Sequence, residues 1–176
     1  MNLANITLIS FGYFDNDFLR KIAENIYIEF QLKVQIKEGH LDLSEYYDPA
    51  RRQYNANKLL QQIENHYSPD AVKMIGLFNV DLFIPIFTYI FGQAYLGGRT
   101  GIASIFRLSN ERYGIEQDEN ILLKRFSKEI IHELGHTFGL IHCYDPDCVM
   151  RSSTYVEDID QKSSILCPNC RSITEF

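Results

Sequence analysis

The segment from His132 to His142, HELGHTFGLIH, constrains this chain more than any other feature of its sequence. On a helix each residue advances by about 100°, so His132 and His136 point to the same side, one turn apart, and both imidazoles can bind one metal ion. His142 would point elsewhere if the helix simply continued. Gly139 removes this difficulty, because glycine readily adopts the left-handed conformation that ends a helix and reverses the chain. The spacing therefore predicts three histidine ligands, two on a helix and one beyond it.

The residue after the first histidine gives this metal site a catalytic character. Three neutral imidazoles leave the fourth position of a tetrahedral zinc ion open to water, whose pKa zinc lowers to about 7. Glu133 can accept a proton from that water, which predicts amide hydrolysis without a covalent intermediate. Because HExxH alone also occurs on ordinary amphipathic helices, the prediction depends on Gly139 and His142 at their fixed spacing. His40 and His66, outside the motif, are expected on the surface.

Four cysteines in the last quarter of the chain indicate a second metal site. They are Cys143, Cys148, Cys167 and Cys170. Four thiolates compose a closed structural zinc site, and the spacing of the last two fits a tight turn around a metal. In an extended chain Cys143 points away from the face that carries His142, so we expect two separate sites. Two disulfides, in any of three pairings, or free thiols are the alternatives.

Strand and helix patterns alternate in the first half of the chain and predict an α/β fold. The expected strands and helices, in chain order, are at 6–9, 17–30, 32–36, 55–66 and 71–78. Such alternation favours a mostly parallel sheet covered by helices. The glycine-rich residues 91–108 suggest a hairpin or irregular strand pair near a sheet edge, where an extended peptide could add as a strand, or else a turn that binds no ligand. Residues 121–138 are the predicted active-site helix.

The length of 176 residues favours one domain, residues 1–176. Within it we expect an N-terminal subdomain at about 1–139 and a C-terminal subdomain at about 140–176. The second is loop-rich and has too few apolar residues to fold alone, so a structural zinc ion would stabilise it. The net charge of −6 gives no reason to expect nucleic acid as a partner.

Neither secretion nor a membrane partner is expected from the sequence. The first residues lack the basic start of a secretory signal. The most apolar segment, 82–91, has about half the length of a membrane span and contains Pro85. We therefore expect a cytoplasmic protein, in whose reducing environment clustered cysteines are more typical of metal sites than of disulfides.

The zinc motif and the cysteines after it resemble those of the archaemetzincin family, zinc metallopeptidases of the metzincin clan. In that family the third histidine is followed by a cysteine, a second cysteine, a nearby methionine and a distal CxxC. The corresponding positions here are Cys143, Cys148, Met150, Cys167 and Cys170. The resemblance implies a metzincin-like zincin fold with a mixed twisted sheet, packed helices and an active-site helix. It also implies that Met150 forms a methionine turn, a hydrophobic base beneath the catalytic zinc.

Residues and resemblance together predict a zinc-dependent metallopeptidase with two zinc ions per chain, one catalytic and one structural. No pro-segment with a blocking cysteine precedes the motif, so we expect small or restricted peptide substrates, with aminopeptidase action as one mode. The sequence does not predict the oligomeric state. The alternative function is a catalytically silent, zinc-stabilised module that binds peptides. Glu133 argues against it, because a module that only binds has no chemical need for a carboxylate there.

Overall fold

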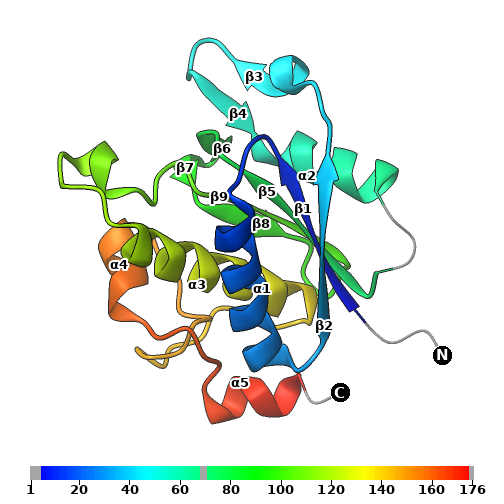
Figure 1. The fold of residues 1–176 in the computed structure, drawn as a ribbon, viewed down its shortest axis with the longest axis vertical. Coiled ribbons are helices and arrows are strands. Elements are labelled where there is room, and N and C mark those ends of the chain that lie inside the picture. The colour runs from blue at the N-terminus through cyan, green and yellow to red at the C-terminus, as the bar shows by residue number, and fades with distance from the viewer. Residues whose placement is uncertain (1–4, 68–70, 175–176) are drawn as a thin grey trace.

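The computed structural model describes residues 5–67 and 71–174 (Figure 1). Its first half alternates strands and helices near the positions that the sequence predicts. In chain order the elements of this half are β1 (Asn5–Phe11), α1 (Asn16–Phe30), β2 (Lys33–Gly39), a 3-10 turn (Leu43–Tyr46), β3 (Tyr47–Asp48), β4 (Gln53–Asn55), α2 (Ala56–His66) and β5 (Lys73–Phe78). The remaining elements are β6 (Leu82–Ile84), β7 (Phe87–Ile90), β8 (Gly92–Ala94), β9 (Thr100–Ser104), a 3-10 turn (Asn110–Tyr113), α3 (Glu119–Thr137), α4 (Val156–Gln161) and α5 (Pro168–Ile173).

Five strands form the main sheet in the order β2-β1-β5-β9-β8. β1 pairs in parallel with β2 and β5, and β5 with β9, whereas β8 runs antiparallel to β9. The glycine-rich hairpin predicted from the sequence is thus β8–β9, with β8 at the edge of the sheet. A mostly parallel, helix-covered sheet confirms the predicted α/β class.

Helices cover both faces of this sheet because the central strands are apolar on both sides. On β1, Ile6 and Leu8 belong to the hydrophobic cluster that includes α1 and α3. Ile9 and Phe11, which point to the opposite face, belong to the cluster that includes α2. This alternation follows from the two-residue period of a strand. Figure 1 shows α1 crossing one face of the sheet and α2 lying behind the other.

A second, smaller sheet of short strands has the order β3-β4-β6-β7. Figure 1 shows β3 and β4 projecting from one end of the molecule. The sequence did not predict this sheet, since its strands are too short to show a clear period. The apolar segment 82–91 supplies its β6–β7 hairpin. Among the described residues no helix is both long enough and apolar enough to span a membrane.

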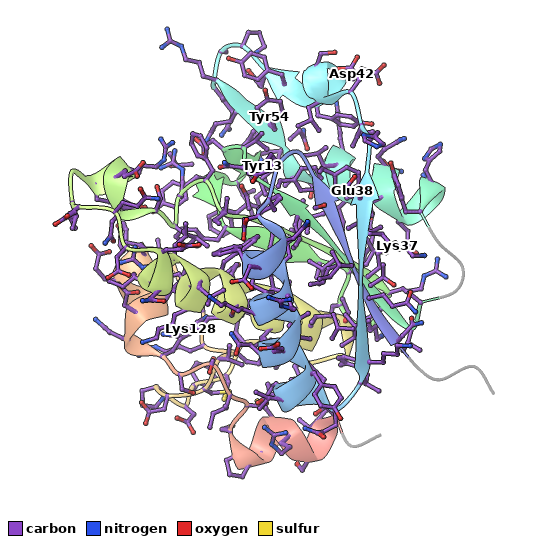
Figure 2. The ribbon with its side chains drawn as sticks, in the orientation of Figure 1. Tyr13, Lys37, Glu38, Asp42, Tyr54 and Lys128 are labelled. Atoms are coloured by element: carbon purple, nitrogen blue, oxygen red, sulfur yellow. The ribbon has the colours of Figure 1, made fainter. Side chains whose placement is uncertain are left out.

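The active-site helix α3 begins at Asp118, whose Oδ1 accepts hydrogen bonds from the amides of Asn120 and Ile121 at 2.9 and 3.1 Å. It ends where Gly139 adopts the left-handed conformation with φ of 92°, as the sequence predicts. The chain that follows packs back on α3. In Figure 2 Lys128 projects from α3, and its ammonium group donates to the carbonyl of Ile159 in α4 at 2.9 Å.

The C-terminal segment shares its core with the rest of the molecule. Val149, Met150 and Ile159 are fully buried in the same hydrophobic cluster as the residues of α1 and α3. Around this core the segment forms two short helices, α4 and α5. Its apolar residues are few, and they pack in one cluster with residues of the N-terminal part of the chain.

Candidate metal centre and active site

Three histidine side chains converge at the end of α3. One nitrogen of each of His132, His136 and His142 lies within 4.8 Å of the others. The first two come from successive turns of α3, and the third comes from the chain after the turn at Gly139. The left-handed glycine therefore has the effect expected from the sequence: it reverses the chain so that His142 returns to the helix.

The hydrogen bonds of these rings suit metal binding. His132 Nδ1 lies 2.8 Å from the carbonyl of Val149, and His136 Nδ1 lies 2.7 Å from that of Leu140. Each Nδ1 therefore carries the proton, and each Nε2 is left as an unprotonated ligand atom. The two Nε2 atoms are 3.1 Å apart, close to the separation of about 3.3 Å that tetrahedral zinc imposes on two nitrogens at about 2.0 Å. The site fits a zinc ion.

Three charged side chains are buried beside the histidines. Glu133 is 3% exposed, Glu129 lies one helical turn earlier at 4%, and Lys162 is 2% exposed. The two carboxyl groups share a hydrogen bond. The Lys162 ammonium group donates to the carbonyl of Arg151 at 2.9 Å and lies 3.4 Å from His132 Nδ1. It is the cation that offsets two buried carboxyl groups.

Burial dominates the pKa values in this cluster. It lowers the pKa of His132 well below the usual value, and the charge of Lys162 lowers it further. Burial also lowers the pKa of His136 and of His142. The neutral imidazoles that bind metals are therefore favoured. Burial raises the pKa of Glu133 well above its usual value, and the adjacent Glu129 adds to this rise.

The four cysteines gather at a separate place. Their sulfur atoms all lie within 4.8 Å of one another, and none of the four forms a disulfide. Cys143 Sγ and Cys167 Sγ are 3.8 Å apart, the separation of about 3.8 Å that tetrahedral zinc with bonds of about 2.3 Å requires. His142 and Cys143 are adjacent in sequence but join different groups, as their opposite directions in an extended chain predict.

Backbone amides point at the sulfur atoms of this cluster. The amide of Cys170 lies 3.5 Å from Cys167 Sγ and lowers the pKa of that thiol. Two amides, those of Cys167 and Met150, lie 3.4 and 3.5 Å from Cys148 Sγ. Amides in such positions stabilise the thiolates that a zinc ion binds. Burial acts in the opposite direction at Cys148 and Cys170, whose pKa values it raises.

Met150 lies beneath the histidine cluster and is fully buried. It packs so closely against α3 that a Cβ atom added to Gly135 would overlap its sulfur atom and lie 2.9 Å from its Cε. The methionine turn that the family resemblance implies at Met150 stays a prediction, and the structure packs this residue against α3 one position before His136.

A cleft of about 660 Å³ opens over the histidines. Its floor is α3, with Glu129, His132, Glu133 and His136. The strands β6, β7 and β8 contribute one set of lining residues, which we call the strand wall, and residues 152–155 after Met150 contribute a second set, the loop wall. The lining also includes large apolar side chains, namely Ile84, Phe87, Ile90, Phe91, Leu96 and Ile141.

Sequence reasoning did not identify Glu129, Lys162 or the cleft residue Tyr89. Glu129 could have been found, because it precedes Glu133 by four residues and so shares its helix face. Lys162 gave no signal, since it reaches the site from a segment whose path depends on the folded C-terminal region. His40 and His66 are exposed, as expected.

Comparisons with known proteins agree with this geometry. Residues 1–175 match the model of a family described as Peptidase family M54. The chain is 38% identical over 174 residues to an archaemetzincin from Pyrococcus furiosus, covering 94% of this chain and 89% of that protein. It is similar to the crystal structure of an archaemetzincin from Methanopyrus kandleri, with TM-score 0.86 and 30% identity, covering 98% and 94% of the two chains. It is also similar to a zinc-dependent peptidase from Methanocorpusculum labreanum, with TM-score 0.86 and 28% identity, covering 97% and 100%.

Proposed function

Because this chain belongs to peptidase family M54, the archaemetzincins, and is a zinc metallopeptidase, we propose that Glu133 is the general base for peptide hydrolysis at a zinc ion held by the three histidines. The four cysteines hold a second, structural zinc ion in this proposal. One observation carries it: unprotonated Nε2 atoms converge beside Glu133, whose buried Oε2 has no hydrogen-bond partner among the described residues. A buried acceptor without a partner in an active-site cleft fits a group that receives a proton from water.

Different residues of the chain have different roles in the proposed reaction. A zinc ion bound by the three imidazoles would polarise the substrate carbonyl and make water more acidic. Glu133 takes the proton from the attacking water and then delivers it to the leaving amine, so that the carboxylate is regenerated. Val149 and Leu140 hold the His132 and His136 rings through their Nδ1 atoms. The apolar cleft walls exclude bulk water, which strengthens each of these interactions.

The edge strand β8 offers backbone groups to a peptide. The flanking residues Phe91 and Tyr95 point their backbone groups towards β9, as the bonds from the Ser104 amide to Phe91 O at 2.8 Å and from the Tyr95 amide to Thr100 O at 3.0 Å indicate. The intervening Gly92 and Ala94 therefore point theirs to the open side, along the cleft. We infer that an extended substrate pairs with these two residues as an added strand.

We also propose that the substrates are short or otherwise restricted peptides, since the cleft is walled on both sides. A cytoplasmic location belongs to the same proposal, because free cysteines persist in a reducing environment. An aminopeptidase mode would require the cleft to be closed on the side that receives the N-terminus of the substrate.

The test is Glu133→Gln, which keeps the size of the side chain but cannot accept a proton. We expect two zinc ions per chain, as in the wild type, and a fall in kcat by about 10²- to 10⁴-fold on a mixed peptide library. His136→Ala should retain one zinc ion and lose activity. Glu24→Gln, an exposed glutamate on α1, is the matched control and should behave as the wild type.

Two outcomes would overturn the proposal. Full activity in Glu133→Gln would exclude this residue as the general base. A wild-type protein that binds two zinc ions and peptides, yet cleaves none of them, would be the catalytically silent binding module.

A further inference from the structure

A hydrogen bond joins the two walls of the cleft. Tyr89 in β7 and Thr154 in the segment after Met150 both line the cleft. The Tyr89 hydroxyl group donates to the carbonyl oxygen of Thr154 at 2.8 Å. The two residues are far apart in sequence, and the main sheet and α3 do not require this bond. Its effect is therefore on the shape of the cleft that both residues line.

Both partners are held in place from outside the cleft. The Arg107 guanidinium lies 4.0 Å from the centre of the Tyr89 ring and forms two hydrogen bonds to Asp81, at 2.5 and 2.7 Å. The ring also meets Phe91 edge-on, with centroids 5.6 Å apart. Arg107, which Asp81 holds in place, and Phe91 thus fix the position of the Tyr89 ring. The hydroxyl group is therefore oriented towards Thr154 by contacts other than its own hydrogen bond.

Hydrogen bonds also hold the loop wall, which carries Thr154, in place. Asp158 Oδ2 accepts hydrogen bonds from the amides of Thr154 and Tyr155, each at 2.9 Å, at the start of α4. These bonds orient the Thr154 carbonyl group towards the cleft. Because other groups hold both partners in place, the hydrogen bond between Tyr89 and the Thr154 carbonyl is a structural part of the cleft lining.

The position of this contact along β8 determines which part of a substrate it meets. Gly92, the first residue of β8, lies over Glu133, since an added Cβ there would be 2.8 Å from Glu133 Oε1. Tyr89 precedes Gly92, so the contact lies beyond the catalytic glutamate at the β7 end. At the other end of β8, the amide of Gly97 donates to the carbonyl of His136 at 2.9 Å.

A substrate strand that pairs with β8 in the antiparallel sense runs in the opposite direction. Its C-terminal part then points to the β7 end, towards Tyr89 and Thr154. Antiparallel pairing is slightly more stable per residue than parallel pairing. At about 3.3 Å per residue, the three residues from Gly92 back to Tyr89 leave at most about 10 Å for the part of the substrate beyond the scissile bond.

We propose that the Tyr89–Thr154 contact closes the cleft on the leaving-group side, and that Tyr89 thereby restricts cleavage to bonds near the C-terminus of a peptide. The inference rests on the proposed function and adds a substrate class to it. The peptide bond is broken by water as above, and the released fragment is two or three residues long at most. The N-terminal part of the peptide lies on the other side of the scissile bond, towards Ala94, so the products are the reverse of those of an aminopeptidase.

The experiment measures cleavage of a mixed peptide library by mass spectrometry and counts the residues on the C-terminal side of each cut. The wild type should release short C-terminal fragments. Tyr89→Phe, which removes only the hydroxyl group, should raise kcat/KM for peptides with six residues beyond the cut relative to those with two, by about five- to tenfold. Tyr89→Ala, which also removes the ring, should raise this ratio further.

The matched control is Tyr113→Phe, because Tyr113 also donates its hydroxyl group to a backbone carbonyl, that of Arg107, at 2.6 Å, but does not line the cleft. It should leave the ratio unchanged. Cleavage by the wild type at interior bonds or one residue from the N-terminus would overturn the inference, as would an unchanged ratio in both Tyr89 variants. A wild-type protein with both zinc ions that cleaves nothing would instead overturn the proposed function, and this inference with it.

Discussion

Gly135 lies in α3, where packing against Met150 requires glycine although glycine is unfavourable in a helix. In the middle of a helix, glycine costs about 0.5–1 kcal/mol relative to alanine. Here an alanine Cβ would overlap the sulfur of Met150. We therefore predict that Gly135→Ala lowers the free energy of unfolding by about 1–3 kcal/mol, as overpacking of a core does. Urea denaturation measures this change.

Shortening the opposing side chain provides the control for this prediction. Met150→Ala makes room for the new methyl group, so the double variant should be more stable than the sum of the two single changes, by at least about 0.5 kcal/mol. A stabilising Gly135→Ala would contradict the clash, since it would leave helix propensity as the only effect.

At the scale of single residues, the sequence predicted those site residues that belong to one continuous motif. The three histidines and the left-handed Gly139 follow from helix geometry alone, and the structure brings them together. Lys162 could not be found in this way. Its ammonium group is near His132 only because the chain after α4 turns back under α3, and no local period encodes that path.

At the scale of elements, the docking of α5 on α1 depends on one buried carboxylate. Glu29 is 4% exposed. It accepts hydrogen bonds from the amide of Leu166 at 2.9 Å and from Arg171 at 2.5 Å. Burial nevertheless raises the pKa of Glu29 above its usual value of 4.5, and these two donors only reduce the rise. Folding therefore favours the protonated form of Glu29.

The raised pKa of Glu29 determines how the stability of the fold changes with pH. A carboxyl group with a raised pKa contributes stability below 4.5, and this contribution is lost as the pH rises through the pKa of the folded state. We predict that the wild type loses stability relative to Glu29→Gln as the pH rises through this window. The measurement is the free energy of unfolding of both proteins at a series of pH values. Glu24→Gln, on the same helix but exposed, should show no such change, and a wild type that gains stability over Glu29→Gln would contradict the prediction.

Elements with a clear period were predictable, and short ones were not. The amphipathic patterns of α1, α2 and α3 span three turns or more and predicted these helices to within two residues. The strands β6 and β7 have three and four residues, too few to distinguish a strand from any apolar run. The strand β4, which pairs with β6, lies almost 30 residues earlier in the chain, so this wall of the cleft could not be predicted from local sequence.

At the scale of the whole molecule, the C-terminal segment is held in two ways. Its apolar residues join the core around α3, and its four cysteines form the proposed zinc site, which crosslinks the segment internally. The carbonyl of Val149, which orients His132, and the side chain of Met150 both belong to this segment. The structural site should therefore support catalysis without contact to the substrate.

We predict that Cys170→Ser lowers the zinc content by one ion per chain and accelerates amide exchange in residues 143–174, while β1 and β5 keep their protection. The reason is that the segment has little core of its own, whereas the two strands are covered on both faces by helices. Peptidase activity should fall in parallel, because a loosened segment no longer holds the Val149 carbonyl at His132 or Met150 against α3. Ser164→Ala, an exposed change in the same segment, is the control and should alter none of these quantities. If exchange increased equally in β1 and β5, the segment and the sheet would unfold as one cooperative unit, and the local role assigned to the cysteine site would be wrong.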